Sequence, residues 1–199
     1  MKYTRFFTSI IIICTFFFEI IPAKNPTQII ISPLISQIDS TFVPFCDRLP
    51  PIKFDVQSVI DESPSRDSSG IVGETRIRRN TMQSIICNPV PSEVVRRSLL
   101  AILSGCNNAS DTGSEASSQI SITIVEFSLK ETSKRITQTM DASIILKVIV
   151  SSPAGTITPK QFTVSAGSSY TTLDTSKHSE RILRQALSDA LREILKNCE

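Results

Sequence analysis

The sequence has few of the side chains that most often carry out chemistry or stack on ligands. It contains no tryptophan, two tyrosines, one histidine and six glycines among 199 residues. A Ser-His-Asp or Cys-His site would depend on His178, and no G-x-S-x-G motif accompanies it. The sequence also has no CxxC pair, no His-Cys cluster and no glycine loop with phosphate-binding spacing. We therefore expect no enzymatic activity, no cofactor and no metal ion.

A charge excess of either sign is absent as well. The 21 basic and 19 acidic residues give a formal net charge of +2. Removal of the segment 1–23 takes away Lys2, Arg5 and Glu19, so the chain stays close to neutral. Proteins that bind nucleic acid usually have a basic excess, and those that bind single strands add aromatic stacking platforms. We expect no nucleic-acid partner.

The N-terminal segment 1–23 has the pattern of a secretory signal peptide. Lys2 and Arg5 precede an apolar run from Phe6 to Phe18, and polar sequence follows Pro22-Ala23. This run is shorter than the about 20 apolar residues of a membrane-spanning helix. We predict cleavage after Ala23 and export to the periplasm or cell envelope, or secretion. Membrane association then requires either a retained signal or a lipid on Cys14, which lies inside the apolar run rather than after a small residue.

Four cysteines follow the signal, and an even number in an exported chain is compatible with two disulfide bonds. They are Cys46, Cys87, Cys106 and Cys198. Three pairings are consistent with the sequence, and unpaired cysteines buried as small apolar residues are the alternative. We expect Cys198 to connect the last helix to an earlier segment, with the partner left open.

The remaining chain divides into a proline-rich leader, residues 24–50, and a single domain, residues 51–199. Pro26, Pro33, Pro44 and Pro50 prevent a long helix or a central strand in the leader, so we expect it to be extended. Residues 53–60 and 70–77 are predicted strands that form an edge pair. A helix is predicted from Pro91 to Leu103, and a polar, disordered loop over residues 107–118.

Alternating apolar residues predict a three-stranded antiparallel meander over residues 119–167. Ile120, Ile122 and Ile124 alternate in one phase and Val125, Phe127 and Leu129 in the other, which predicts a bulge and a change of face. The last helix has an apolar stripe from Ile182 to Leu195. Together these elements predict an α+β fold, with an antiparallel sheet of about five strands and two helices packed on one face.

Two groups of charged residues are candidates for ligand binding. Asp61 and Glu62 follow the first predicted strand and could hold a cation or act as an acid-base pair, but a turn before Pro64 is the simpler interpretation. Arg76 and Arg78 lie on one side of the second strand and could bind an anion, or they could protect a sheet edge.

The order of elements resembles the YajG-type bacterial envelope lipoproteins. The matching residues are Ser58-Val59-Ile60-Asp61-Glu62-Ser63-Pro64, then Ile71-Val72-Gly73, and then the helix from Val94 to Leu103 with Gly105 after it. The resemblance covers residues 52–197 and implies an envelope location and an α+β domain, without catalytic residues. Ser63 stands where the family typically has arginine, and the family's lipid anchor has no convincing counterpart at Cys14.

We therefore expect an exported cell-envelope domain with a non-enzymatic binding or structural role. Its partner would be an envelope protein or a small ligand. The alternatives are an auxiliary component of an envelope transporter, a secreted ligand-binding protein with its pocket between the sheet and the leader, and an exported enzyme that uses the carboxylates around Asp61.

Overall fold

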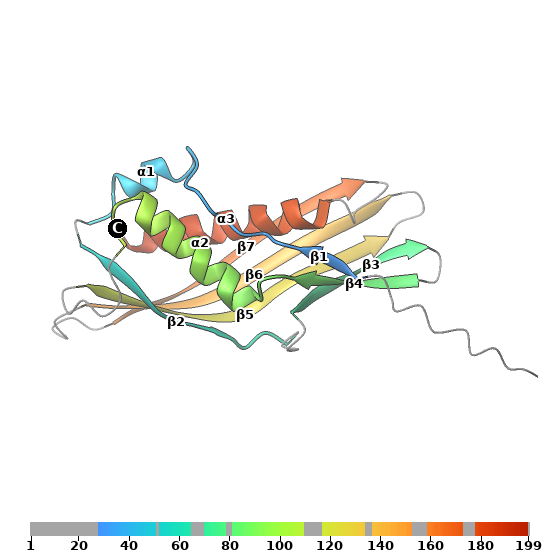
Figure 1. The fold of residues 1–199 in the computed structure, drawn as a ribbon, viewed down its shortest axis with the longest axis horizontal. Helices are drawn as coiled ribbons and strands as arrows, with labels where there is room; N and C mark the ends of the chain where they lie inside the picture. Colours follow the sequence, from blue (N-terminus) through green and yellow to red (C-terminus); the bar gives the residue numbers. More distant parts are fainter. Residues whose placement is uncertain are drawn as a thin grey trace, which may run out of the picture.

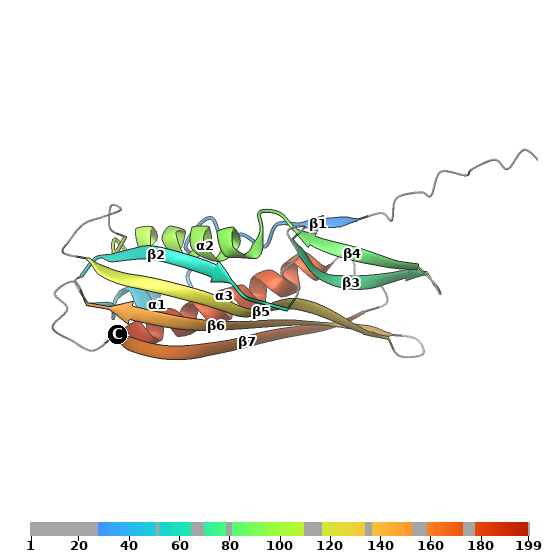
Figure 2. The same ribbon diagram turned by 90° about the horizontal axis from the view of Figure 1, so that it is seen from below.

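The computed structural model describes residues 28–50, 52–64, 70–78, 81–109, 117–133, 137–152, 159–172 and 178–198. They form an α+β fold with one mixed seven-stranded sheet and three helices, of which α2 and α3 are long. Figure 1 and Figure 2 show both long helices on the same face of the sheet. The strands are β1 (Ile29–Ile31), β2 (Phe54–Asp61), β3 (Ile71–Arg78), β4 (Thr81–Cys87), β5 (Ser118–Ser133), β6 (Gln138–Ser151) and β7 (Lys160–Thr172), and the helices are α1 (Val43–Cys46), α2 (Pro91–Gly105) and α3 (Ser179–Cys198).

The predicted meander is confirmed as β5, β6 and β7, which pair antiparallel in sequence order. The predicted bulge is also confirmed, since the register between β5 and β6 shifts between Ile124 and Glu126. The change of face is wrong, however, because Ile124 and Phe127 are both fully buried in the same core. The extra residue corrects the phase of the alternation, so β5 keeps its apolar side chains on the helix side of the sheet along its whole length.

The strand order is β1-β4-β3-β5-β6-β7, with β2 paired to β5. The expected edge pair of the first two predicted strands does not form. Instead, β2 and β3 each pair parallel with β5, β2 along Ser118–Ile124 and β3 beside Leu129 and Lys130. The sheet is thus larger than expected, and it is mixed rather than wholly antiparallel, because β1 also pairs parallel with β4.

Gly73 allows β3 to approach β5 closely. A Cβ atom at this position would lie 2.2 Å from the carbonyl oxygen of Leu129, a distance that no side chain tolerates. The glycine of the Ile71-Val72-Gly73 segment is therefore required by backbone packing between two parallel strands.

The core fills the space between the helices and one face of the sheet. In α2, Val95, Leu99 and Ile102 are fully buried, as the periodicity predicted. In α3, the apolar stripe is buried from Ile182 to Leu195. The opposite face of the sheet is covered by no described helix and carries mainly polar side chains, as is usual for antiparallel sheets with one solvated face.

Residues 28–50, expected as an extended leader, pack against the domain and add to its core. Figure 1 shows this segment running across α2 and α3. It begins with β1, which pairs with β4, and it buries Phe42 completely. Its backbone is also held by the helices, since the amide of Ile35 donates a 3.0 Å hydrogen bond to the hydroxyl of Ser98 in α2. The prolines exclude long regular elements here, but they do not exclude burial.

The predicted signal peptide with Cys14, and residues 110–116 of the predicted polar loop, lie outside the described residues. Among the residues that the structure describes, no helix is both long enough and apolar enough to cross a membrane.

Candidate functional site

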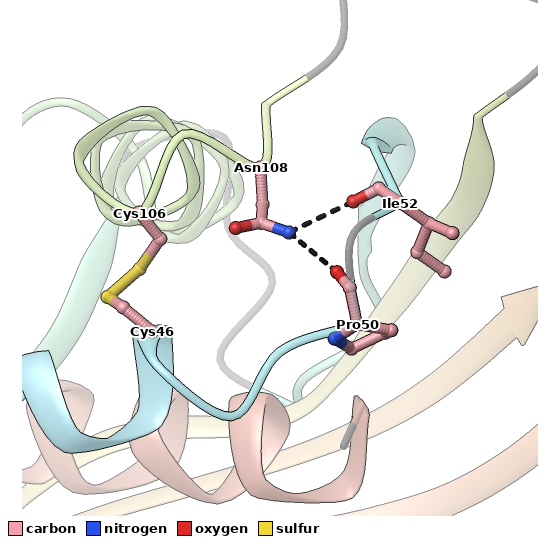
Figure 3. The surroundings of a disulfide bond; sticks show 5 residues. All are labelled: Cys46, Pro50, Ile52, Cys106 and Asn108. Carbon is pink, nitrogen blue, oxygen red and sulfur yellow. Dashed lines mark hydrogen bonds between the residues drawn. A yellow bond between two sulfur atoms is a disulfide. The ribbon is translucent and has the colours of Figure 1, made fainter.

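A disulfide bond joins the N-terminal segment to the end of α2. Figure 3 shows Cys46, at the end of α1, bonded to Cys106, directly after α2, with 5.0 Å between their Cα atoms. The two residues are 60 positions apart in the sequence. This bond anchors the C-terminal end of the packed segment, while β1 anchors its other end.

Asn108 reinforces the same junction. Its side-chain amide donates 3.0 Å hydrogen bonds to the carbonyl oxygens of Pro50 and Ile52 (Figure 3). Asn108 is also buried, and its backbone carbonyl accepts a 2.8 Å bond from the amide of Phe54. Asn108-Ala109-Ser110 matches the glycosylation sequon, but a glycan would replace one of the two hydrogens that this nitrogen donates to Pro50 and Ile52. Asn108 therefore has a structural role.

Cys87 and Cys198, the other two cysteines among the described residues, are free thiols, so the expected second disulfide does not form, and Cys198 does not connect α3 to another segment. Burial raises the pKa of Cys87 to about 12 and that of Cys198 to about 11. The nearby charge of Glu180 adds to the rise in pKa at Cys87, whereas Lys160 opposes it at Cys198. Both thiols are protonated at neutral pH, which makes them poor nucleophiles.

The carboxylate candidates form a turn. One oxygen of Asp61 accepts hydrogen bonds from the backbone amide of Ser63 at 3.0 Å and from its hydroxyl at 2.6 Å. Glu62 is exposed, and its amide donates a 2.9 Å bond to the carbonyl of Ile124 in β5. No group of three metal-ligating side chains occurs among the described residues. Ser63 thus closes an Asx turn that ends β2.

The arginine candidates lie in β3. Arg76 is exposed, and its backbone amide donates a 3.0 Å hydrogen bond to a carboxylate oxygen of Glu131. The side chain of Arg78 falls outside the described residues, although its backbone pairs with Thr81 in β4. The structure does not bring Arg76 together with Asp61 or Glu62 in one site.

Two open hollows meet at Arg181 in the first turn of α3. One has a volume of about 300 Å³ and lies between α3 and residues 34–39. The other has a volume of about 260 Å³ and lies between α3 and the end of β7. Arg181 and Gln185 line both hollows, so these two side chains form the ridge between them.

The cation of Arg181 has an aromatic partner, and none of the described carboxylates pairs with it. Its guanidinium carbon lies 4.5 Å from the centre of the Tyr170 ring, and the ring of His178 lies 4.6 Å from the same centre. No carboxylate among the described residues pairs with Arg181, whereas the neighbouring Arg184 pairs with Glu180 at 2.6 Å. A cation on an aromatic ring beside a polar hollow can bind an anionic group.

Sequence reasoning connected neither Arg181 nor His178 to Tyr170. The contact depends on β7 ending above the start of α3, which is a tertiary feature that local periodicity does not encode. Arg181, Tyr170 and Gln185 are therefore the site residues that the sequence missed.

A scan against family models and a search of curated proteins found no match to this chain. Its fold is similar to that in the crystal structure of a Xanthomonas campestris protein assigned to the DUF330 family model, with a TM-score of 0.55 and 14% sequence identity. The similarity covers 83% of this chain and 92% of that chain. It is also similar to a protein described as uncharacterized, with a TM-score of 0.51, 11% identity and coverage of 87% of this chain and 100% of the other.

A minor lipoprotein from Acinetobacter baumannii matches less well, with a TM-score of 0.40, 12% identity and coverage of 55% of this chain and 85% of that chain. At these identities, the two better matches support the fold and leave the function open.

Proposed function

We propose that this chain is an exported cell-envelope domain with a non-enzymatic binding or structural role. The observation that carries the proposal is the Cys46–Cys106 disulfide in a chain whose N-terminal segment 1–23 has the pattern of a secretory signal. Structural disulfides form and persist in oxidising compartments such as the periplasm and the extracellular space. The bond also holds the segment after the signal against the domain, so the exported part is one packed unit.

Cell fractionation with mass determination of the native N-terminus tests export directly. We expect the chain in the envelope or periplasmic fraction, beginning at Lys24, with one intact disulfide. A cytoplasmic chain that begins at Met1 and has free thiols at both Cys46 and Cys106 would refute the proposal.

The non-enzymatic role rests on the site geometry. Asp61 is engaged in a turn, and the ring of His178 packs at a tilt against the ring of Tyr170. Screening against hydrolytic substrates should therefore give no turnover. If turnover appears and Asp61→Asn abolishes it while Glu93→Gln on α2 does not, the enzymatic alternative is correct.

A ligand-binding role is the second candidate, and the hollows at Arg181 favour it. The hollow of about 300 Å³ lies between α3 and the N-terminal segment, where Arg181 and Arg184 line it together with Asp39, and its size suits a small ligand whose carboxylate or phosphate group contacts Arg181. We propose that such an anion binds Arg181. Native mass spectrometry of the protein purified from its own envelope, followed by titration of the ligand found, tests this.

Arg181→Ala should weaken that binding at least about tenfold, since a charge-assisted hydrogen bond contributes roughly 1.5–3 kcal/mol. Arg96→Ala on α2 is a matched control, because Arg96 is also exposed on a helix and lines neither hollow. Equal affinity in both variants would exclude Arg181 as the binding residue. The envelope-transporter alternative and the YajG-type resemblance remain compatible with either role.

A further inference from the structure

The two long edges of the sheet differ in their protection against pairing with another strand. β7 forms one edge, where Figure 2 shows it as the outermost strand, and the opposite side of the sheet is bordered by β2 and by the short strand β1. β2 carries Asp55 and Asp61, and its register with β5 shifts between Val56 and Ser58. Charged side chains and bulges are the usual devices that discourage edge-to-edge association.

β7 has none of these devices after its first residue. Its register with β6 is continuous from Lys160 to Thr172, and the strand contains neither proline nor any charged residue other than Lys160. On the sheet face opposite the helices, it presents the small polar side chains of Thr163, Ser165 and Ser169, all exposed. Among the described residues, no strand pairs with its outer side.

We propose that this protein dimerises by antiparallel pairing of β7 with β7 of a second copy, which makes one continuous sheet. The register that overlaps the whole strand places the twofold axis at Ala166. Lys160 then lies opposite Thr172 of the second copy, so the two lysines are at opposite ends of the interface and do not repel each other. In an antiparallel ladder, about half of the residues of a strand direct both their N–H and their C=O group to the same neighbouring strand. About half of the β7 residues therefore face the second copy, which gives about twelve backbone hydrogen bonds between the two β7 strands.

The occupant is a second copy because the edge is self-complementary. Apart from Lys160 at its end, the β7–β7 register places neutral residues opposite neutral residues, and the same surface on both copies closes the assembly at two. Pairing of β7 with β2 of another copy would instead extend without limit. The bulge and the acidic residues of β2 oppose that alternative.

Two double variants that differ at one position test the register. Thr163 and Ser169 lie directly opposite each other across the proposed axis, and within one chain they face Lys147 and Asp141 of β6. In the Thr163→Glu/Ser169→Lys variant, the carboxylate introduced at position 163 lies opposite the cation introduced at position 169 of the second copy. Within each chain, the new carboxylate faces Lys147 and the new cation faces Asp141, so every pair has opposite charges. In the Thr163→Glu/Ser169→Glu variant, like charges meet across the axis, and the carboxylate introduced at position 169 also faces Asp141 within its own chain.

Sedimentation velocity of the exported chain, over a range of concentrations, measures the assembly. We expect a dimer for the unmodified chain and for the Glu/Lys variant, and a dissociation constant at least about tenfold higher for the Glu/Glu variant, with the difference shrinking at about 1 M salt. Circular dichroism should show that both variants fold. A monomeric unmodified chain would overturn the proposal, as would equal dimerisation of both folded variants.

Discussion

Removing the Cys46–Cys106 disulfide should destabilise the protein by a large fraction of its folding free energy. The bond closes a loop between residues 60 positions apart. In the chain-entropy description, a loop of this length restricts the unfolded state by about 14 cal/mol/K, which corresponds to about 4 kcal/mol at 25 °C. We expect the Cys46→Ser/Cys106→Ser variant to lose up to this amount.

Urea unfolding followed by circular dichroism measures the loss. With a slope of about 2 kcal/mol/M, a loss of about 4 kcal/mol lowers the midpoint by about 2 M. A reducing agent should lower the midpoint of the unmodified chain to a similar extent and leave that of the double variant unchanged, since Cys87 and Cys198 are already free. Equal midpoints for the oxidised chain and the double variant would refute the reasoning.

Three further predictions concern the packing of the domain. Gly73→Ala should lower the free energy of unfolding in urea by about 1–3 kcal/mol, because its Cβ would lie 2.2 Å from the Leu129 carbonyl oxygen. Gly167→Ala, whose Cβ has its nearest contact at 3.3 Å, should lower it less, and equal losses for the two variants would contradict the prediction. Asn108→Ala should cost about 1–3 kcal/mol in thermal unfolding, because the carbonyls of Pro50 and Ile52 lose their side-chain donor; an unchanged melting temperature would contradict this. The third concerns the thiols: with pKa values of about 12 and about 11, Cys87 and Cys198 should react with iodoacetamide at pH 8 at least about 100-fold more slowly in the folded chain than in urea. Because the pKa values of both thiols are higher in the folded than in the unfolded chain, ionisation of the thiols destabilises the folded state. This contribution to the free energy of unfolding is complete below about pH 9 and is lost as the pH rises through about 11. Rapid labelling of the folded protein would contradict both the slow reaction and this pH dependence.

Local periodicity predicted the elements that are long and regular. The alternation along β5, β6 and β7, the phase slip at Ile124 and the apolar stripe of α3 all have direct structural counterparts. β4 was missed because Gln83 occupies a buried position of the strand between Thr81 and Ile85, which breaks the apolar pattern. The partner of β2 is β5, and β3, β4 and α2 lie between them in the chain, so short-range patterns favoured the wrong pairing.

The candidate site was harder to predict than the fold. Asp61 and Glu62 stood out as neighbouring carboxylates, but hydrogen bonds to Ser63 and β5 explain their positions. Arg181 has no unusual sequence neighbours, and only the meeting of β7 with the start of α3 gives it Tyr170 as a partner. The burial of Phe42 was equally hard to predict. The prolines of its segment indicate which backbone conformations are excluded, but they do not indicate which side chains pack against the domain.

The attachment of residues 28–50 at both ends determines how the domain responds to mechanical force. A pull on the chain ahead of Gln28 first loads the short pairing of β1 with β4, which should detach early. Unravelling could then proceed through Ile35 and Phe42 as far as Cys46, where the covalent bond to Cys106 stops it. At most residues 28–45 can therefore be drawn out while the disulfide is intact, and the tension bypasses β2, β3, β4 and α2, which lie between Cys46 and Cys106 in the chain.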